Sequence, residues 1–136
     1  MNKTDLAYIA GLVDGEGSIY TSYQPSRVQE LPRYNVGIAI QMADKEPLAF
    51  LQSLFGGRII LRKKMSENRK PLYYWRLTNF QAQPLLEAIK PYLLVKRAQA
   101  EIALRMLNAH KKWRHYSPIE RFLQEADALA IKELNK

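Results

Sequence analysis

Two acidic residues and three glycines fall within nine residues near the start of the chain, Ile9-Ala10-Gly11-Leu12-Val13-Asp14-Gly15-Glu16-Gly17. Upstream of it, Thr4 and Asp5 are suited to cap the start of a helix that Gly15 and Gly17 would close. Two acidic residues therefore fall at a helix C-terminus, where the macrodipole is negative and the last carbonyl groups lack partners. Since acids there destabilise a helix, the stretch predicts either a bound cation with hard oxygen ligands or a solvated, glycine-rich turn.

This helix has two contrasting sides. Leu6, Ile9 and Val13 form a bulky stripe that we expect to anchor the helix to the core of its own chain. A stripe of small residues at i, i+3, i+4 and i+7 lies on the other side and consists of Ala7, Ala10, Gly11 and Asp14. The small stripe predicts close packing of another helix, which belongs either to a second subunit or to the same chain.

The periodicity changes from helical to alternating after Gly17. The predicted order is α β β α β β α α α, with a first helix up to Gly17, strands at 18–24, 34–41, 58–64 and 72–78, and helices after Asp44 and at 80–89, 95–111 and 117–134. Each strand has one apolar and one polar or basic face, so helices are needed on one side only. We therefore expect a single α+β domain over residues 1–136, with a core at about 4–112 and a C-terminal helical extension at about 117–134.

The charge of the chain is unevenly distributed. Its 136 residues contain 21 Lys and Arg against 13 Asp and Glu, which gives a net charge of +8 and a pI near 9.8. Most of the excess lies in residues 58–76 and 90–116, each of which holds seven basic residues and one acidic residue. Such blocks are typical either of a surface that follows nucleic-acid phosphates or of a solvated basic face. The chain has no cysteine, which excludes disulfides, thiolate zinc sites and thiol nucleophiles.

Near the start of the chain, the longest uncharged apolar stretch runs from Leu6 to Val13, far short of the roughly 20 residues that a bilayer requires. No basic segment of the signal-peptide type precedes it. We therefore expect a soluble intracellular protein, in the cytoplasm of a prokaryote or in an organelle, that is not secreted and has no membrane partner.

The stretch from Ile9 to Gly17 resembles the nine-residue motif of the LAGLIDADG homing endonucleases. The order of predicted elements, the single copy of the motif and the basic strand pair fit that family as well. The resemblance implies a homodimer in which the motif helices pack together through Ala7, Ala10, Gly11 and Asp14. Each chain would lay a saddle-shaped, four-stranded antiparallel sheet in the major groove of one half of a near-palindromic double-stranded DNA site. That site would span about 20 base pairs.

The resemblance also implies a phosphodiester hydrolase that cuts both DNA strands and leaves short 3′ overhangs. Glu16 would hold Mg²⁺ together with the backbone carbonyl of Gly15, and Mn²⁺ or Ca²⁺ could occupy the same site. Lys96 would balance charge on the phosphate, and a polar residue after the second strand, Asp44 or Gln41, would order solvent. Glu16 replaces the commoner Asp, and Asp44 stands where relatives often have Gln, so Asp44 is equally interpretable as an N-cap.

Base contacts are expected from the polar side chains that face outward on the four strands. They are Ser18, Tyr20, Ser22, Gln24, Asn35, Gln41, Arg58, Arg62, Tyr74 and Arg76. Lys63, Lys64, Lys111, Lys112 and Arg114 are candidates for phosphate contact or for solubility alone.

Two other functions fit the same sequence. A protein of the same fold could bind nucleic acid without cleaving it, as an intron RNA maturase or a DNA-binding regulator does, and a basic α+β protein could bind RNA structurally. The retained Glu16 favours cleavage, because an acid is unfavourable on a surface that only has to approach phosphates.

Overall fold

In the computed structural model of the chain, residues 1–25, 33–62, 68–112 and 117–136 are described. Their elements follow in the order α1 (Lys3–Glu16), β1 (Gly17–Gln24), β2 (Arg33–Met42), α2 (Glu46–Phe55), β3 (Arg58–Arg62), β4 (Leu72–Thr78), η1 (Asn79–Gln81), α3 (Gln83–Ile89), η2 (Lys90–Tyr92), α4 (Arg97–Lys112) and α5 (Pro118–Leu134). This is the predicted α+β order, and the pattern of alternation after Gly17 therefore identified the strands correctly.

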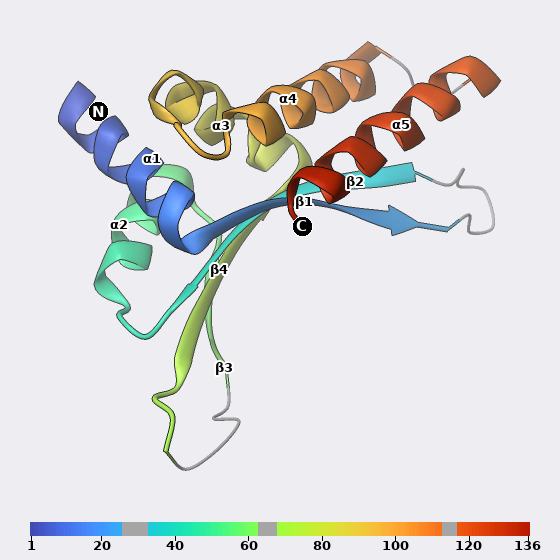
Figure 1. The fold of residues 1–136 in the computed structure, drawn as a ribbon. Helices are drawn as coiled ribbons and strands as arrows, with labels where there is room; N and C mark the ends of the chain where they lie inside the picture. Colours follow the sequence, from blue (N-terminus) through green and yellow to red (C-terminus); the bar gives the residue numbers. More distant parts are fainter. Residues whose placement is uncertain (26–32, 63–67, 113–116) are drawn as a thin grey trace.

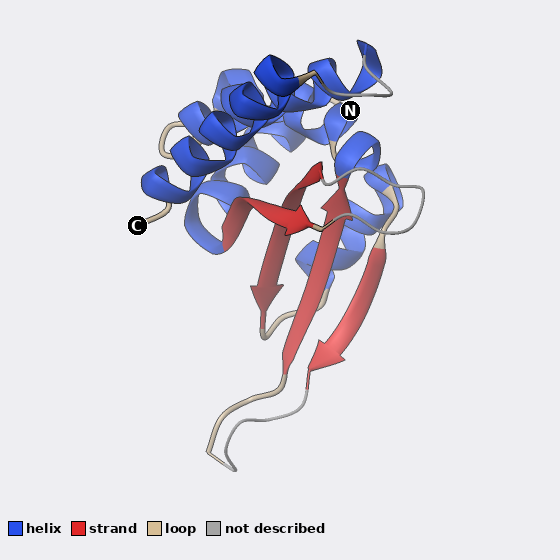
Figure 2. Ribbon diagram, turned by 90° about the vertical axis from the view of Figure 1, so that its right-hand side faces the viewer, coloured by secondary structure: helices blue, strands red, loops and turns tan. Residues whose placement is uncertain are grey.

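The four strands form one antiparallel sheet in the order β1-β2-β4-β3. Figure 1 shows a strongly twisted sheet, with β1 and β2 running beneath α4 and α5 while β3 and β4 extend away from the helices. Figure 2, turned by 90°, shows the helices gathered at one end and side of the sheet. The opposite face of the sheet is left open, as the two-sided character of the strands predicts.

The core lies between the helices and the apolar face of the sheet. Ile19, Ile38, Trp75 and Leu77 project from the strands and are fully buried, or nearly so, together with residues of α1, α3 and α4. Full burial of such side chains contributes about 1.5–3 kcal/mol each. The same parity of residues that points these side chains inward points Ser18, Gly37 and Arg76 outward, so the core fixes which residues the open face presents.

The glycines between α2 and β3 are required by local geometry. Gly56 and Gly57 have positive φ angles of 78° and 91°, which favour glycine. A Cβ atom on Gly57 would lie 2.7 Å from Nε1 of the buried Trp75, and that indole N–H donates to the carbonyl of Gly56 at 2.9 Å. This turn therefore locks the beginning of β3 onto the core.

Helix caps agree with the sequence at one end of the chain and differ at the other. Ser117 caps α5 in the predicted capping box with Glu120. The N-cap of α1 is Asn2, with Asp5 as its capping-box partner, so the expectation that Thr4 or Asp5 caps this helix was wrong. The N-cap of α2 is Lys45 without a side-chain hydrogen bond, so the interpretation of Asp44 as an N-cap was wrong too.

The C-terminal helix is part of the domain. Arg105 on α4 pairs with both carboxylate oxygens of Asp127 on α5, the shorter distance being 2.6 Å. Asn135, just after α5, donates to the carbonyl of Ile19 on β1 at 2.8 Å. The extension thus covers the β1-β2 side of the sheet. No helix in the described ranges is long and apolar enough to cross a membrane.

Candidate active site and nucleic-acid interface

The motif stretch forms a direct junction between helix and strand, because β1 begins at the residue that follows α1. A Cβ atom on Gly17 would lie 3.0 Å from the Val13 backbone and 3.3 Å from the carbonyl oxygen of Ala39. Glycine therefore allows the chain to leave the helix close to both α1 and β2. As a result, Glu16 ends the helix at the edge of the sheet and is exposed.

Asp14 holds this junction to the beginning of α4. Its carboxylate accepts hydrogen bonds from the backbone N–H groups of Leu94, Val95 and Lys96 at 2.8, 3.2 and 2.9 Å. Partial burial raises the pKa of the Asp14 carboxyl, but these three donors and the charge of Lys96 hold that pKa below its usual value. The carboxylate therefore works as a structural clamp between α1 and the segment that leads into α4.

Lys96 neutralises the negative end of α1. Its Nζ donates to the backbone carbonyl of Asp14 at 2.7 Å, and its side chain is half-buried. A cation that bonds a terminal carbonyl interacts favourably with the helix macrodipole. The predicted lysine, Lys96, thus contacts Asp14, which directly precedes Gly15 and Glu16.

Gln41 is placed near the same edge by the register of the sheet. Gly17 pairs with Ile40, so the next residue of β2 continues toward the end of α1 where Glu16 lies. Gln41 is exposed and is on the open face of the sheet. The structure therefore gathers Gly15, Glu16, Lys96 and Gln41 at one corner of the molecule.

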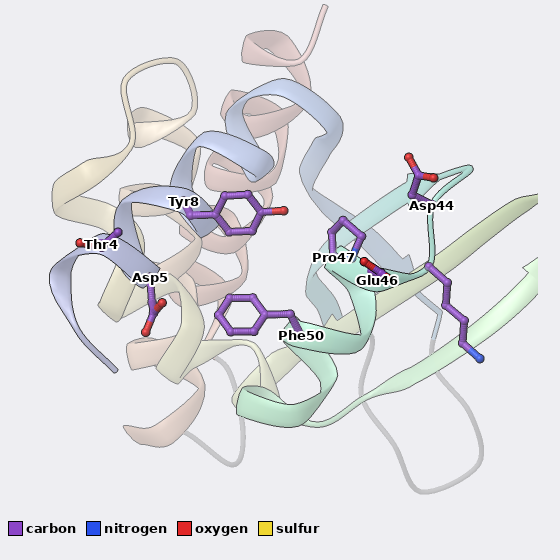
Figure 3. A pocket seen from close by; sticks show the side chains of 8 residues that line it. Thr4, Asp5, Tyr8, Asp44, Glu46, Pro47 and Phe50 are labelled. Carbon is purple, nitrogen blue, oxygen red and sulfur yellow. The ribbon is translucent and has the colours of Figure 1, made fainter.

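Asp44 lies in a different setting. It is exposed and lines an open groove between the first half of α1 and the beginning of α2, together with Tyr8, Pro47 and Phe50. Figure 3 shows Asp44 at the rim of this groove, on the side remote from Thr4 and Asp5. The role expected of Asp44, ordering solvent beside Glu16, stays a prediction.

The predicted small stripe on α1 is only partly exposed. Ala7 and Gly11 are exposed, but Ala10 is fully buried in the core of its own chain and has no surface to offer a partner. The expectation that Ala10 lies at a subunit interface was therefore wrong: its Cβ points toward the same core as Ile9. The exposed small residues of α1 are instead Ala7, Gly11 and Gly15, spaced at i, i+4 and i+8. A Cβ atom on Gly11 or Gly15 would meet no other atom within 4 Å, so the surface beside them is open.

All ten side chains expected to contact bases lie on the open face of the sheet, as the register shows. In the row nearest Glu16, Ser18, Ala39, Arg76 and Arg58 are aligned across four strands. Arg58 and Arg76 stand directly opposite each other, an arrangement of like charges that destabilises a sheet. Both are exposed, so an anionic partner would relieve this repulsion. Lys63, Lys64, Arg114 and the side chains of Lys111 and Lys112 lie outside the described residues.

Aromatic rings on this face are already packed within the chain. Tyr20 lies across Gly37, where a Cβ would be 2.4 Å from the Tyr20 Cζ atom, so the ring requires the glycine. Burial raises the pKa of the Tyr20 hydroxyl, and nearby Tyr74 raises it further. That hydroxyl is buried and makes no hydrogen bond of standard geometry among the described residues, but it lies close enough to the Arg76 guanidinium for that cation to offset part of the rise in its pKa. Arg62 stacks over the Tyr74 ring, with its Cζ 4.1 Å from the ring centroid.

Polar side chains at the far end of β1 and β2 form a connected network. The Gln24 Oε1 atom accepts from Arg33 Nε at 3.1 Å and from Asn35 Nδ2 at 3.2 Å. Asn35 Oδ1 accepts from Asn79 Nδ2 at 3.0 Å, and Asn79 Oδ1 accepts from the Val36 N–H at 3.0 Å. Arg33 and Asn79 were not among the predicted site residues. Arg33 lies just outside the strand predicted at 34–41, and the positive φ of 50° at Asn79 marks a position where Asn is enriched.

The corner that holds Glu16 offers two kinds of oxygen ligand to a cation. In the part of the chain that the structure describes, no group of three or more His, Asp or Glu side chains could hold a metal ion. Glu16 and Gly15 are exposed at the end of α1, where they offer a carboxylate and a backbone carbonyl as oxygen ligands. They suit Mg²⁺, which usually binds through one or two carboxylates, waters and substrate phosphates.

The α+β fold, with its arginine-bearing open face and its acidic corner, is similar to that of several solved structures. Among solved structures, the archaeal intron-encoded homing endonuclease I-Vdi141I complexed with DNA matches with a TM-score of 0.80 and 20% identity, over 98% of this chain and 85% of that one. The homing endonuclease I-CvuI in complex with its target in the presence of Ca matches at 0.74 and 23% identity, over 96% and 82%. The LAGLIDADG meganuclease I-CpaMI bound to uncleaved DNA matches at 0.66 and 21% identity, over 85% of this chain but 39% of that one.

The chain therefore has the fold of the LAGLIDADG homing endonucleases, and the resemblance predicted from the motif is confirmed at the level of fold. No protein-family model matches the sequence, nor does any curated protein sequence at a significant level.

Proposed function

We propose that this protein is a site-specific DNA endonuclease of the LAGLIDADG homing type that acts as a homodimer with divalent metal. One observation carries the proposal: the Glu16 carboxylate ends α1 beside the row of the open face that bears Arg58 and Arg76. A face that only bound phosphates would be weakened by an acid at this position, whereas a face that also hydrolyses them needs an oxygen ligand there.

Each residue of the corner has a role in this proposal. Glu16 and the Gly15 carbonyl would hold Mg²⁺, or Mn²⁺ or Ca²⁺ in its place. The metal, when bound, supplies charge stabilisation at the phosphate and a lower pKa for water. Lys96 would reduce the negative charge at the end of α1, so that a phosphate can approach it. Gln41 would offer its side-chain amide to solvent. For Asp44 we propose only a peripheral role, since it lines the groove shown in Figure 3.

A second copy of the chain would complete the site. The exposed line of Ala7, Gly11 and Gly15 on α1 permits close approach of a partner helix, and Asp14 orders the flanking segment. Leu94 and Val95 stand beside Asp14 and are 87% and 69% exposed, which is unfavourable in water. Packing of two α1 helices would cover these groups and bring the two Glu16 corners to one DNA duplex of about 20 base pairs.

The proposal is tested by selecting cleaved sites from a randomised plasmid library with purified protein in the presence of Mg²⁺ or EDTA. We expect linear products with Mg²⁺ only, a selected site with two-fold symmetry, and a dimer by light scattering without DNA. Binding of a specific duplex without cleavage in any divalent metal would instead show a binding protein of the same fold. A monomer at micromolar concentration would contradict the proposed assembly.

A further inference from the structure

The network at the far end of the β1-β2 hairpin has a fixed hydrogen-bond polarity. An Arg Nε–H and a backbone N–H can only donate, and these two groups form its two ends at Arg33 and Val36. Asn79 must therefore turn its oxygen toward Val36 and its amide nitrogen toward Asn35. Asn35 in turn offers oxygen to Asn79 and nitrogen to Gln24, whose oxygen receives both Asn35 and Arg33. No other orientation of the three amides satisfies every contact.

This polarity determines what the hairpin presents outward. Both lone pairs of the Gln24 oxygen accept hydrogen bonds within the network. The part of the Gln24 side chain that can still bind a partner is therefore the Nε2 amide group, which is a donor. Arg33 uses Nε in the network and keeps the N–H groups of its two Nη atoms, which are donors as well. Arg33 is exposed and Gln24 half-exposed, and the two residues pair across β1 and β2 on the open face. Asn35 uses one of its two amide N–H groups and one lone pair of its oxygen in the network, and these two bonds fix the orientation of its side chain.

We propose that Gln24 and Arg33 form a donor-only subsite that selects guanine at the outer part of each half-site, with Asn35 and Asn79 as its positioning residues. In the major groove guanine presents two acceptors, N7 and O6, side by side. Adenine and cytosine each present an amino donor there, and thymine presents one acceptor beside a methyl group. Only guanine therefore offers two partners to a pair of donors. The inference rests on the proposed function, because it assumes that the open face lies in the major groove.

The position of the subsite follows from the length of β1. Gln24 is eight residues beyond Glu16 along an uninterrupted strand, a span of about 26 Å at about 3.3 Å per residue. At about 3.4 Å per base pair this places the selected guanine about seven or eight base pairs from the cleavage position, and two-fold symmetry repeats it in the other half-site.

The substitution Asn79→Asp provides a test that a merely structural role would not satisfy. An aspartate accepts the Val36 N–H but cannot donate to Asn35, so Asn35 is expected to turn its amide nitrogen toward residue 79 and its oxygen toward Gln24. Gln24 then turns its nitrogen inward and its oxygen outward, and the Arg33 Nε–H gives up its bond to the inward-facing Gln24 oxygen. The outer subsite thereby gains an acceptor, and its preference is expected to move from guanine toward adenine, which presents one acceptor and one donor. Asp also tolerates the positive φ of this position.

The experiment compares site selections by wild type, Asn79→Asp, Arg33→Ala and the control Asn108→Asp on exposed α4, with melting temperatures measured alongside. We expect wild type and control to prefer guanine by about tenfold or more at the outer position. Arg33→Ala should lose that preference, and Asn79→Asp should change the base selected while cleavage at the centre persists.

Several results would overturn the inference. A wild-type site with no guanine at the outer position does so, as does an Arg33→Ala variant that loses affinity equally for all sequences, because that identifies a phosphate contact instead. A folded Asn79→Asp variant that keeps the guanine preference contradicts the assigned polarity. If wild type binds and cleaves no duplex at all, the proposed function fails first and the subsite falls with it. A cleaved site without the guanine leaves the proposed function standing.

Discussion

The two hairpins of the sheet are supported in different ways. The β1-β2 hairpin lies beneath α4 and α5, is tied to the C-terminus through Asn135, and ends in the network around Gln24. The β3-β4 hairpin is held at its root by Gly57 and Trp75 and extends away from the helices. Near its outer end Ile60 and Leu61 are 49% and 57% exposed. The β1-β2 hairpin is therefore organised before any partner binds, whereas β3-β4 is held at its root and leaves apolar side chains exposed at the outer end of β3.

The largest effect is expected at the root of β3-β4. In Gly57→Ala the new methyl group meets the buried Trp75 and Leu77, and the positive φ of 91° adds strain. Strain and overpacking of this kind cost about 1–3 kcal/mol each, so urea denaturation should show a loss of about 2–6 kcal/mol. Gly56→Ala is the matched control, since it has similar strain but no contact closer than 3.7 Å, and it should cost less. Equal losses in the two variants would show that the Trp75 contact does not lock the root.

The clamp of Asp14 between α1 and the segment that leads into α4 should be nearly as sensitive to substitution. Asp14→Asn removes the charge from a carboxylate that accepts three backbone hydrogen bonds, and a loss of about 2 kcal/mol is expected at pH 7. Because folding lowers the pKa of Asp14, its contribution is complete above the unfolded pKa near 3.8 and disappears as pH falls through the lower folded pKa. The difference between wild type and variant should therefore shrink below about pH 4. Asp44→Asn is the exposed control, and a constant difference across pH would contradict the clamp.

A smaller effect is expected in the middle of β1-β2. Gly37→Ala places a methyl group 2.4 Å from Tyr20 Cζ, and the ring can move away because it is half-exposed. We expect a loss of about 1 kcal/mol together with release of the buried Tyr20 hydroxyl, visible as a pKa of Tyr20 closer to its ordinary value in an ultraviolet titration. Ala39→Gly, at the neighbouring outward position of β2, should leave that titration unchanged. A Gly37→Ala variant with an unchanged Tyr20 titration would mean that the ring does not depend on the glycine.

The smallest effect is expected at the tip of β3-β4. Leu61→Thr replaces an exposed apolar side chain with a β-branched polar one, so stability should change by no more than about 0.5 kcal/mol. The same exchange at buried Leu77 should cost several times more. Suppose that Leu61→Thr proves as costly as Leu77→Thr in the same denaturation experiment. Leu61 is then covered in solution, and the two hairpins differ less in their support than the structure indicates.

The difference between the two hairpins also explains which features of the fold could be predicted from the sequence. Alternation placed all ten outward side chains on one face, because a strand packed on a core fixes the direction of every residue. Direction does not guarantee burial: Leu61 lies on the same face as Ile59 but is exposed, because β3 runs beyond the helices that would cover that face. The prediction for Ala10 rested on helical spacing, which did not distinguish the flank of the buried stripe from the exposed line of Ala7 and Gly11.

Long-range contacts account for the rest. The clamp of Asp14 on residues 94–96 and the bond of Lys96 to the end of α1 join segments about 80 residues apart, and no periodicity reports such contacts. Local chemistry predicted the capping box at Ser117 and Glu120, since all its partners lie within four residues. Arg33 was missed for a related reason: it lies beside an uncertain strand boundary, where alternation gives no direction.

The corner formed by the end of α1 is the proposed site of metal-dependent cleavage. The most direct test measures single-turnover cleavage of the selected DNA site by wild type, Glu16→Gln and the control Glu101→Gln, which lies on the exposed side of α4. We predict that Glu16→Gln binds the site with near-normal affinity but loses at least about 10²-fold in cleavage rate, while Glu101→Gln is unchanged. Metal-dependent cleavage at the wild-type rate by a Glu16→Gln variant would contradict the account.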